Sequence, residues 1–269
     1  MPVTTQLPDR RVVLSGAANM RDLGGIPVRG GTVQPGLLYR SASLAKLDDA
    51  DERTFTTLDI ATVYDLRTAA ERQGALDRLP EATRTVWLDV VADAPDNIAA
   101  SIPALLADPA ALESTLGGGR ANEYLEDANR KFVSMPSALK AYRRFFLDLI
   151  DDRRTGTALF HCTTGKDRTG WAATSFLLLL GASEEDVRAD YLETNTDLAP
   201  ALQPMLDALA ARGVNTALLQ PVLGVRDSCL DAALDELVIR YDDIENYART
   251  GLGLTGDQID ALRTRFICL

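Results

Sequence analysis

Four short apolar runs, each bounded by turn or charged residues, stand out along the chain. They are residues 37–40, 60–66, 85–91 and 157–160. Short apolar runs with turn or charged residues at their ends are typical of buried β-strands. A further segment, residues 24–33, has two apolar stretches around a glycine-bearing turn and predicts a β-hairpin.

Helical periodicity separates and follows these runs. Apolar residues recur at intervals of three and four in residues 44–58, 137–150, 172–180, 198–211 and 230–247. Strands that alternate with helices predict an α/β fold, with a mainly parallel central sheet flanked by helices. No internal repeat or low-complexity tract divides the chain, so we expect a single domain over residues 1–269.

Residues 93–128 differ in character from the segments on either side. Isoleucines and leucines fall there at near-helical intervals, but Pro103 and Pro109 interrupt them and Gly117-Gly118-Gly119 follows. One interpretation is a helical insertion or lid over about residues 94–130, with the three glycines as its hinge. Ordinary core packing followed by a plain loop is the alternative, and spacing alone does not separate the two.

Acidic residues outnumber basic ones by 39 to 28, which gives a formal net charge of −11. A surface this acidic is repelled by nucleic acid and by anionic membranes, so we expect neither as a partner. No apolar run approaches the roughly 18 to 20 residues that a membrane-spanning helix needs. Residues 1–11 lack the order of basic and apolar residues that marks a secretory signal, so we expect a cytoplasmic protein. Export without such a signal stays open, as does the oligomeric state.

Histidine and cysteine are scarce, and their scarcity excludes several kinds of site. The chain has one histidine, His161, and three cysteines, Cys162, Cys229 and Cys268. One histidine excludes zinc and iron sites built from several, and three cysteines do not make a disulfide framework. A thiol oxidoreductase is a poor match too, because Cys162 has no partner in a Cys-x-x-Cys pair. The composition therefore argues against these kinds of site.

The segment from His161 to Gly170 (HCTTGKDRTG) carries the main chemical signal. An apolar run precedes it and a helical, apolar run follows, which predicts a strand, a loop and a helix N-terminus in that order. Backbone N–H groups and the positive end of the helix dipole converge at such a loop and form a cradle for an anion. The same donors stabilise a Cys162 thiolate, and Arg168 offers two parallel N–H groups to phosphate oxygens. Gly165 permits the tight turn between them.

Two neighbours complete the predicted site. The Thr169 hydroxyl can donate to the thiolate or to an attacking water, and His161 is expected to orient the loop. The alternative for the whole segment is less specific, because a lone cysteine is more often a buried small apolar residue and Cys-x5-Arg also arises by chance. The strand before, the helix after and the glycine inside favour the functional interpretation.

His-Cys-x5-Arg-Thr resembles the phosphate-binding loop of the protein tyrosine phosphatase superfamily. Its Gly-Lys-Asp-Arg form is similar to that of an atypical bacterial branch of tyrosine and phosphoinositide phosphatases, whose members include a secreted mycobacterial enzyme. The resemblance extends over most of the chain. It also rests on Asn19-Met20-Arg21-Asp22, Leu38-Tyr39-Arg40-Ser41, Asp65-Leu66-Arg67, Asp190-Tyr191-Leu192 with Asn195, and Val222-Leu223-Gly224-Val225-Arg226.

This resemblance implies the phosphotyrosine phosphatase fold, often with a mobile helical lid, and hydrolysis of phosphate monoesters without a metal or cofactor. It implies that the Cys162 thiolate attacks phosphorus and forms a phosphocysteine, which water then hydrolyses. The substrates that it implies are phosphotyrosine and, in addition, phosphoserine, phosphothreonine or phosphoinositides. The substrate-binding residues that it implies are Thr163, Thr164, Gly165, Lys166, Asp167 and Arg168.

The leaving oxygen of a phosphate monoester needs a proton, which a carboxylic acid is expected to supply. Asp89 lies near the end of the third apolar run and Asp93 follows it, in the part of the chain where this superfamily keeps its acid, and Asp93 is our first choice. The chain lacks the Trp-Pro-Asp form of that segment. Asp167 inside the loop is the third candidate, and a solvated loop aspartate is the alternative for both Asp89 and Asp93.

Other charged positions have two interpretations each. Lys166 is either a second cation at the mouth of the pocket, in contact with substrate, or an ordinary surface lysine. Arg67 ends a strand at the carboxyl edge of the sheet, where ligands bind, and is a candidate substrate contact. An ion pair with Asp65 is the simpler interpretation of Arg67. We interpret Asn19, Arg21, Asp22 and Arg40 as structural for the same reason.

Two alternatives to a protein phosphatase stay open at this point. A catalytically silent phosphate-binding module would lack the nucleophile or the arginine, and neither is missing here. A phosphoinositide-specific lipid phosphatase would share the whole loop. The sequence predicts the chemistry of the site but does not select among the phosphorylated substrates.

Overall fold

A five-stranded sheet forms the centre of the protein, and the computed structural model describes residues 9–94 and 114–269. The strand order is β1-β4-β7-β5-β6, with β4, β7, β5 and β6 parallel and β1 antiparallel at the edge. The strands are β1 Arg21–Asp22, β4 Leu38–Ser41, β5 Ile60–Asp65, β6 Arg84–Trp87 and β7 Thr157–His161. The predicted mainly parallel α/β sheet is confirmed.

Both faces of this sheet are covered, as expected for a mainly parallel sheet. Tyr64 and Phe160 are register partners on β5 and β7 and belong to the core on one face. The ring of Phe145, from helix α6, packs against both, with ring centroids 5.1 Å away in each case. The preceding pair, Val63 and Leu159, belongs to a separate core on the other face, because side chains alternate along a strand.

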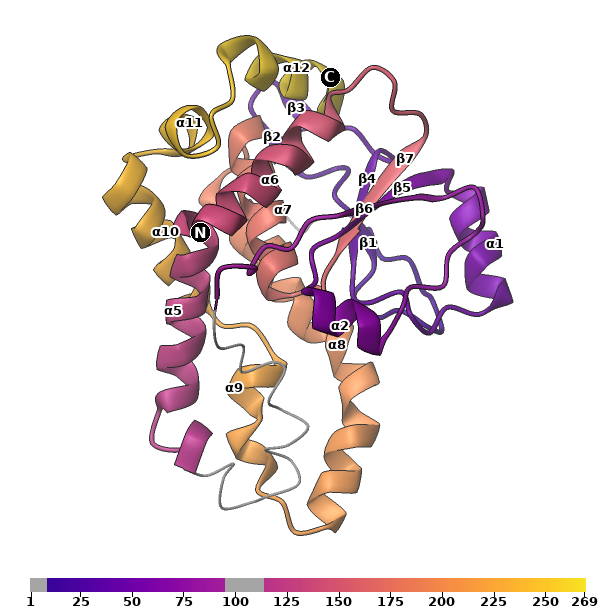
Figure 1. The fold of residues 1–269 in the computed structure, drawn as a ribbon, viewed down its shortest axis with the longest axis vertical. Coiled ribbons are helices and arrows are strands. Elements are labelled where there is room, and N and C mark those ends of the chain that lie inside the picture. Colours follow the sequence, from indigo (N-terminus) through magenta and orange to yellow (C-terminus); the bar gives the residue numbers. More distant parts are fainter. Residues whose placement is uncertain (1–8, 95–113) are drawn as a thin grey trace, which may run out of the picture.

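Helices α6 and α7 cover the first face, and α1 lies on the opposite side of the sheet (Figure 1). No described helix is both long and apolar enough to cross a bilayer. The helices are α1 Asp49–Thr57, α2 Ala69–Gly74, α5 Arg120–Ser134, α6 Pro136–Leu149, α7 Asp167–Leu180, α8 Glu184–Ala211, α9 Gln220–Leu223, α10 Asp227–Tyr241, α11 Ile244–Asn246 and α12 Gly256–Phe266. A 3-10 turn, η1 Thr216–Leu218, and a π-helical turn, η2 Tyr247–Gly251, join some of them.

The predicted hairpin over residues 24–33 is confirmed as strands β2 Pro27–Val28 and β3 Gly31–Val33. Strand β8, Ile267–Cys268, pairs with β3 and completes a small second sheet. The C-terminal end of the chain is thereby fixed next to an N-terminal hairpin.

Several predicted boundaries shift, and capping explains two of the shifts. The helix predicted from residue 44 begins at Asp49, because the Asp48 side chain accepts hydrogen bonds from two N–H groups of its first turn. The helix predicted over residues 198–211 is the second half of α8, which begins after the capping residue Ser183. The third predicted strand ends at Trp87 rather than at residue 91.

A second, smaller apolar cluster lies away from the sheet, where α5, α8, α9 and α10 meet (Figure 1). We call this region the helical lobe. Its buried residues include Leu116, Leu125, Tyr191, Leu209, Val222 and Leu230. Of the predicted lid over residues 94–130, residues 95–113 lie outside the described part of the chain. The single-domain organisation with a lid stays a prediction.

Candidate active site

The predicted loop lies between β7 and α7, at the carboxyl ends of the parallel strands. Cys162 follows β7 directly and is 1% exposed, and α7 begins at Asp167. No side chain in the described part of the chain caps the N-terminus of α7. Its first N–H groups therefore remain available as donors to an anion at the loop.

The turn inside the loop requires glycine at residue 165. Gly165 has φ = +68°, in the left-handed region, where other residues are strained. A Cβ at this position would also lie 2.3 Å from the carbonyl oxygen of Ser41, at the end of β4. The tight turn predicted at Gly165 is thus also packed closely against the neighbouring strand.

Arg168 is buried, and its guanidinium is bonded through Nη1 and Nη2. Nη1 and Nη2 each donate to one carboxylate oxygen of Glu71, both at 2.7 Å, and Nη1 also lies 3.5 Å from the carbonyl oxygen of Leu66. The Nε–H donates to no group of the described residues. The edge formed by Nε and the second proton of Nη2 is therefore free for two oxygens of a phosphate.

Glu71 was not among the residues that the sequence indicated. It caps the N-terminus of α2 together with Thr68, whose N–H lies 2.9 Å from Glu71 Oε2, and it also accepts from the Thr163 hydroxyl. Burial raises the pKa of Glu71, but the hydrogen bonds and charge of Arg168 outweigh it and lower the pKa to about 2. One ionised carboxylate thus connects α2, the loop and the arginine.

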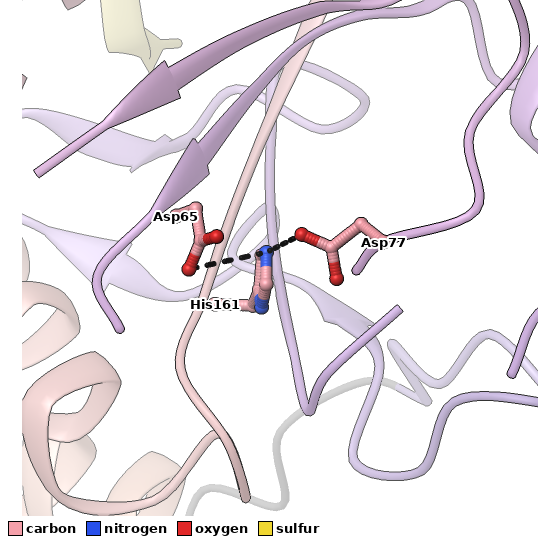
Figure 2. Close-up of side chains that lie close together, drawn as sticks. All are labelled: Asp65, Asp77 and His161. Carbon is pink, nitrogen blue, oxygen red and sulfur yellow. Dashed lines mark ion pairs between the residues drawn. The ribbon is translucent and has the colours of Figure 1, made fainter. Parts of the chain in front are cut away.

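His161 connects the loop to a second carboxylate. Its Nδ1 lies 3.1 Å from the carbonyl oxygen of Cys162, and its Nε2 lies 3.2 Å from Asp77 Oδ2 and 3.9 Å from Asp65 Oδ1 (Figure 2). One ring nitrogen thus faces an oxygen of the loop, and the other faces the two carboxylates.

Asp65, Asp77 and His161 also lie as metal ligands would, with their ligand atoms within 4.8 Å of one another (Figure 2). Arg67 already occupies this space. Its guanidinium donates to both oxygens of Asp65 at 2.8 Å and to Asp77 at 2.6 Å. Arg72 bonds Asp65 as well, at 2.8 Å. The cluster is a network of ion pairs whose acceptor oxygens are occupied by protein donors.

The comparison with known proteins agrees with this geometry. The model of the tyrosine phosphatase family matches residues 12–268. The chain belongs to the tyrosine phosphatase family. A protein named as a tyrosine-protein phosphatase of Cupriavidus necator is 34% identical, over 87% of this chain and 81% of that protein. The triple specificity protein phosphatase PtpB of Mycobacterium tuberculosis is 29% identical, over 93% of this chain and 96% of that protein.

As a phosphatase, the chain acts on a phosphorylated substrate. Two of the residues predicted to contact that substrate, Arg67 and Lys166, instead bond groups of the protein. The Arg67 side chain also donates to Ser43 and to the carbonyl oxygen of Ala75, so all of its N–H groups have partners. Lys166 is buried, with Nζ 2.7 Å from the carbonyl oxygen of Val222 and 3.0 Å from that of Gly224. The structure thus places Lys166 against the helical lobe and not at an open pocket mouth.

The three candidate acids of this phosphatase lie in different environments. Asp93 is exposed and accepts from the backbone N–H of Ser137, 2.7 Å away, in the first turn of α6. Asp167 lies at the start of α7, with Oδ2 3.5 Å from Lys166 Nζ. Asp89 is half-buried and near enough to Arg168 to feel its charge. Burial raises the pKa of Asp89, and the Val91 N–H and Arg168 oppose the rise only in part.

Thr164 and Thr169 complete the predicted loop residues. Thr164 is half-buried, and its carbonyl oxygen accepts from the Asn19 side chain at 3.3 Å. Thr169 is fully buried, and its Oγ1 has no hydrogen-bond partner in the described part of the chain. A buried hydroxyl without a partner is costly, and a thiolate or a bound oxyanion would satisfy it.

Proposed function

We propose that this phosphatase hydrolyses phosphotyrosine in proteins through a phosphocysteine on Cys162. The observation that supports this most directly is the free Nε–Nη2 edge of Arg168. Glu71 bonds the guanidinium through Nη1 and Nη2 and so fixes its orientation. The adjacent Nε–Nη2 edge is thereby preformed beside the loop that begins with the nucleophile. A preformed bidentate donor stabilises the equatorial oxygens of a transferring phosphoryl group without reorganisation.

The reaction has two displacements at phosphorus. In the first, the Cys162 thiolate forms the S–P bond while the bond from phosphorus to the tyrosine oxygen breaks, and an acid protonates that oxygen. In the second, water attacks phosphorus, the S–P bond breaks, and inorganic phosphate leaves with the thiolate restored. No metal ion or other cofactor enters either step.

For the acid we propose Asp89, in place of our first choice from the sequence. An acid must carry its proton near neutral pH, and the raised pKa of Asp89 favours that form. Asp89 also lies on the side of the site occupied by Arg168. Asp93 has a sufficient explanation as a cap of α6, and Asp167 is paired with Lys166.

The substrate range is a separate part of the proposal. The relative from M. tuberculosis is named for triple specificity. We propose phosphotyrosine as the main substrate here, with phosphoserine, phosphothreonine and phosphoinositides as weaker substrates. The engagement of Lys166 with Val222 and Gly224 argues against a lipid-specific enzyme, because the second cation of the loop is not open to an inositol phosphate.

Phosphate release from p-nitrophenyl phosphate, with and without EDTA, tests the chemistry, and a panel of phosphopeptides and phosphoinositides tests the range. We expect hydrolysis that EDTA does not change, and the highest kcat/KM on phosphotyrosine peptides. Loss of activity in EDTA would contradict the metal-free mechanism. A higher kcat/KM on phosphoinositides would contradict the proposed preference. Turnover of none of these esters would indicate a silent phosphate-binding module.

A further inference from the structure

Three consecutive carbonyl groups of the phosphate loop accept hydrogen bonds from residues outside the loop. The carbonyl oxygen of Thr163 accepts from the backbone N–H of Ser43 at 3.1 Å. The carbonyl oxygen of Thr164 accepts from Asn19 Nδ2 at 3.3 Å. That of Gly165 accepts from Asn19 Nδ2 at 3.0 Å and from Arg40 Nη2 at 2.8 Å. All of these donors lie outside the loop.

The planarity of the peptide bond converts these contacts into an orientation of the N–H groups. In a trans peptide the C=O and the following N–H point in opposite directions. Carbonyls held outward at Thr163, Thr164 and Gly165 therefore turn the N–H groups of Thr164, Gly165 and Lys166 inward. None of these three N–H groups donates to an acceptor within residues 9–94 and 114–269. They are the donors that a phosphate would use.

Arg40 is itself fixed by a buried ion network. It is fully buried on β4, with Nη1 2.6 Å from Asp190 Oδ2. Arg21 and Arg10 bond the other oxygen of Asp190, at 3.0 and 2.9 Å. Burial raises the pKa of Asp190, but the three arginines outweigh it and hold that pKa well below its usual range. The carboxylate thus stays charged and keeps Arg40 in one position.

We propose that Arg40, clamped by Asp190, and Asn19 are positioning residues that orient the loop N–H groups for the phosphoryl oxygens. This deepens the proposed function and rests on it, because the oriented groups act on the transferring phosphate. The sequence suggested only a structural role for Arg40. The structure assigns Arg40 a specific role, because it bonds the carbonyl oxygen of Gly165 in the loop as well as Asp190.

Arg10 supplies the matched control. Like Arg40 it bonds Asp190, but its other partners are Glu193 and the carbonyl oxygen of Asp22, and it donates to no group of the loop. Arg10→Gln and Arg40→Gln therefore each remove one positive partner of Asp190, and only Arg40→Gln removes a donor to Gly165. Asn19→Gly removes the second donor without changing the buried charge, and glycine tolerates the φ of +59° at this position.

Tungstate, a phosphate-like oxyanion, reports on the loop without turnover. Its Kd is measured by calorimetry and kcat/KM on p-nitrophenyl phosphate in parallel, with thermal unfolding as the check on folding. We expect Arg40→Gln and Asn19→Gly to raise the tungstate Kd roughly tenfold or more and to lower kcat/KM by up to about a hundredfold. Arg10→Gln should lower Tm while leaving both quantities close to wild type.

An unchanged tungstate Kd in folded Arg40→Gln and Asn19→Gly would overturn the positioning role, as would an equal loss in Arg10→Gln. If Arg40→Gln does not fold, Asn19→Gly decides alone. Calorimetry also separates the two proposals. If the wild-type protein hydrolyses no monoester, the proposed function fails, and the tungstate Kd still shows whether Arg40 and Asn19 orient the loop.

Discussion

Both carboxylate oxygens of Glu71 lie 2.7 Å from the Nη atoms of Arg168, 97 residues further along the chain. The same Glu71 closes the capping box of α2 with Thr68. The N-terminus of a short helix and Arg168, the arginine that we propose to bind phosphate, thus share one carboxylate. Glu71 bonds the Nη1–Nη2 edge of Arg168 and leaves the adjacent Nε–Nη2 edge free, so this contact does not compete with phosphate.

Glu71→Gln should lower kcat/KM by roughly ten- to a hundredfold, because Arg168 loses one of two charge-assisted hydrogen bonds and its ionic partner. Glutamine still suits the capping box, so α2 should persist. Steady-state kinetics on p-nitrophenyl phosphate measure the effect. Arg72→Gln is the control on the same helix, since Arg72 bonds Asp65 and not the loop, and a loss of equal size there would contradict the specific role of Glu71.

The stability that Glu71 contributes should depend on pH in a defined direction. Its pKa is about 2 in the folded protein against an ordinary 4.5. The contribution is therefore complete above about pH 4.5 and is lost as the pH falls towards 2. Denaturant unfolding of wild type and Glu71→Gln at several pH values should show a difference in free energy of unfolding that shrinks on acidification. A difference independent of pH would contradict the ion pair.

Asp89→Asn should remove the fall in activity on the basic side of the pH profile. Asp89 is active as an acid only while protonated, so activity declines as the pH passes above its raised pKa. The loss should be roughly 10²- to 10⁴-fold on phosphotyrosine peptides and small on esters with good leaving groups. The measurement is kcat against leaving-group pKa for Asp89→Asn, Asp93→Asn and Asp167→Asn. A steeper dependence in either of the last two, and not in Asp89→Asn, would assign the acid there instead.

Asp93→Ala should weaken the protein without changing its chemistry. The Asp93 carboxylate accepts from the Ser137 N–H in the first turn of α6, and loss of such a cap costs about 1 kcal/mol in free energy of unfolding. Thermal or urea unfolding measures this, and kcat on p-nitrophenyl phosphate should stay at the wild-type value. Full stability combined with a large loss of kcat would show that Asp93 takes part in catalysis.

The parts of the site that the sequence predicted are those encoded locally. The apolar run before His161, the helical run after Arg168 and Gly165 between them are contiguous, so strand, loop and helix could be predicted together. The parallel sheet followed in the same way from apolar runs separated by helices. Helix limits were predicted less accurately, because capping residues such as Ser183 and Asp48, and not the apolar periodicity, fix where a helix begins.

The residues that sequence reasoning missed or misplaced depend on contacts between distant segments. The Thr68-x-x-Glu71 spacing is a visible capping signal, but nothing local shows that Glu71 also reaches Arg168. Lys166 was predicted either at the pocket mouth or on the surface, whereas the partners of its Nζ come from the helical lobe, 56 and 58 residues later. Arg40 meets Asp190 across 150 residues. Such pairings follow from the packed fold and not from periodicity.

The central claim is that Cys162 carries the phosphoryl group during turnover. Mixing the protein with p-nitrophenyl phosphate, quenching in acid within milliseconds and analysing the peptides by mass spectrometry tests it directly. We predict a mass increase of one phosphoryl group on the peptide that contains Cys162, formed as fast as nitrophenol is released and absent from Cys162→Ser, which should be folded and inactive. Turnover at the wild-type rate in Cys162→Ser, or wild-type turnover with no phosphorylated Cys162 at any time, would contradict it.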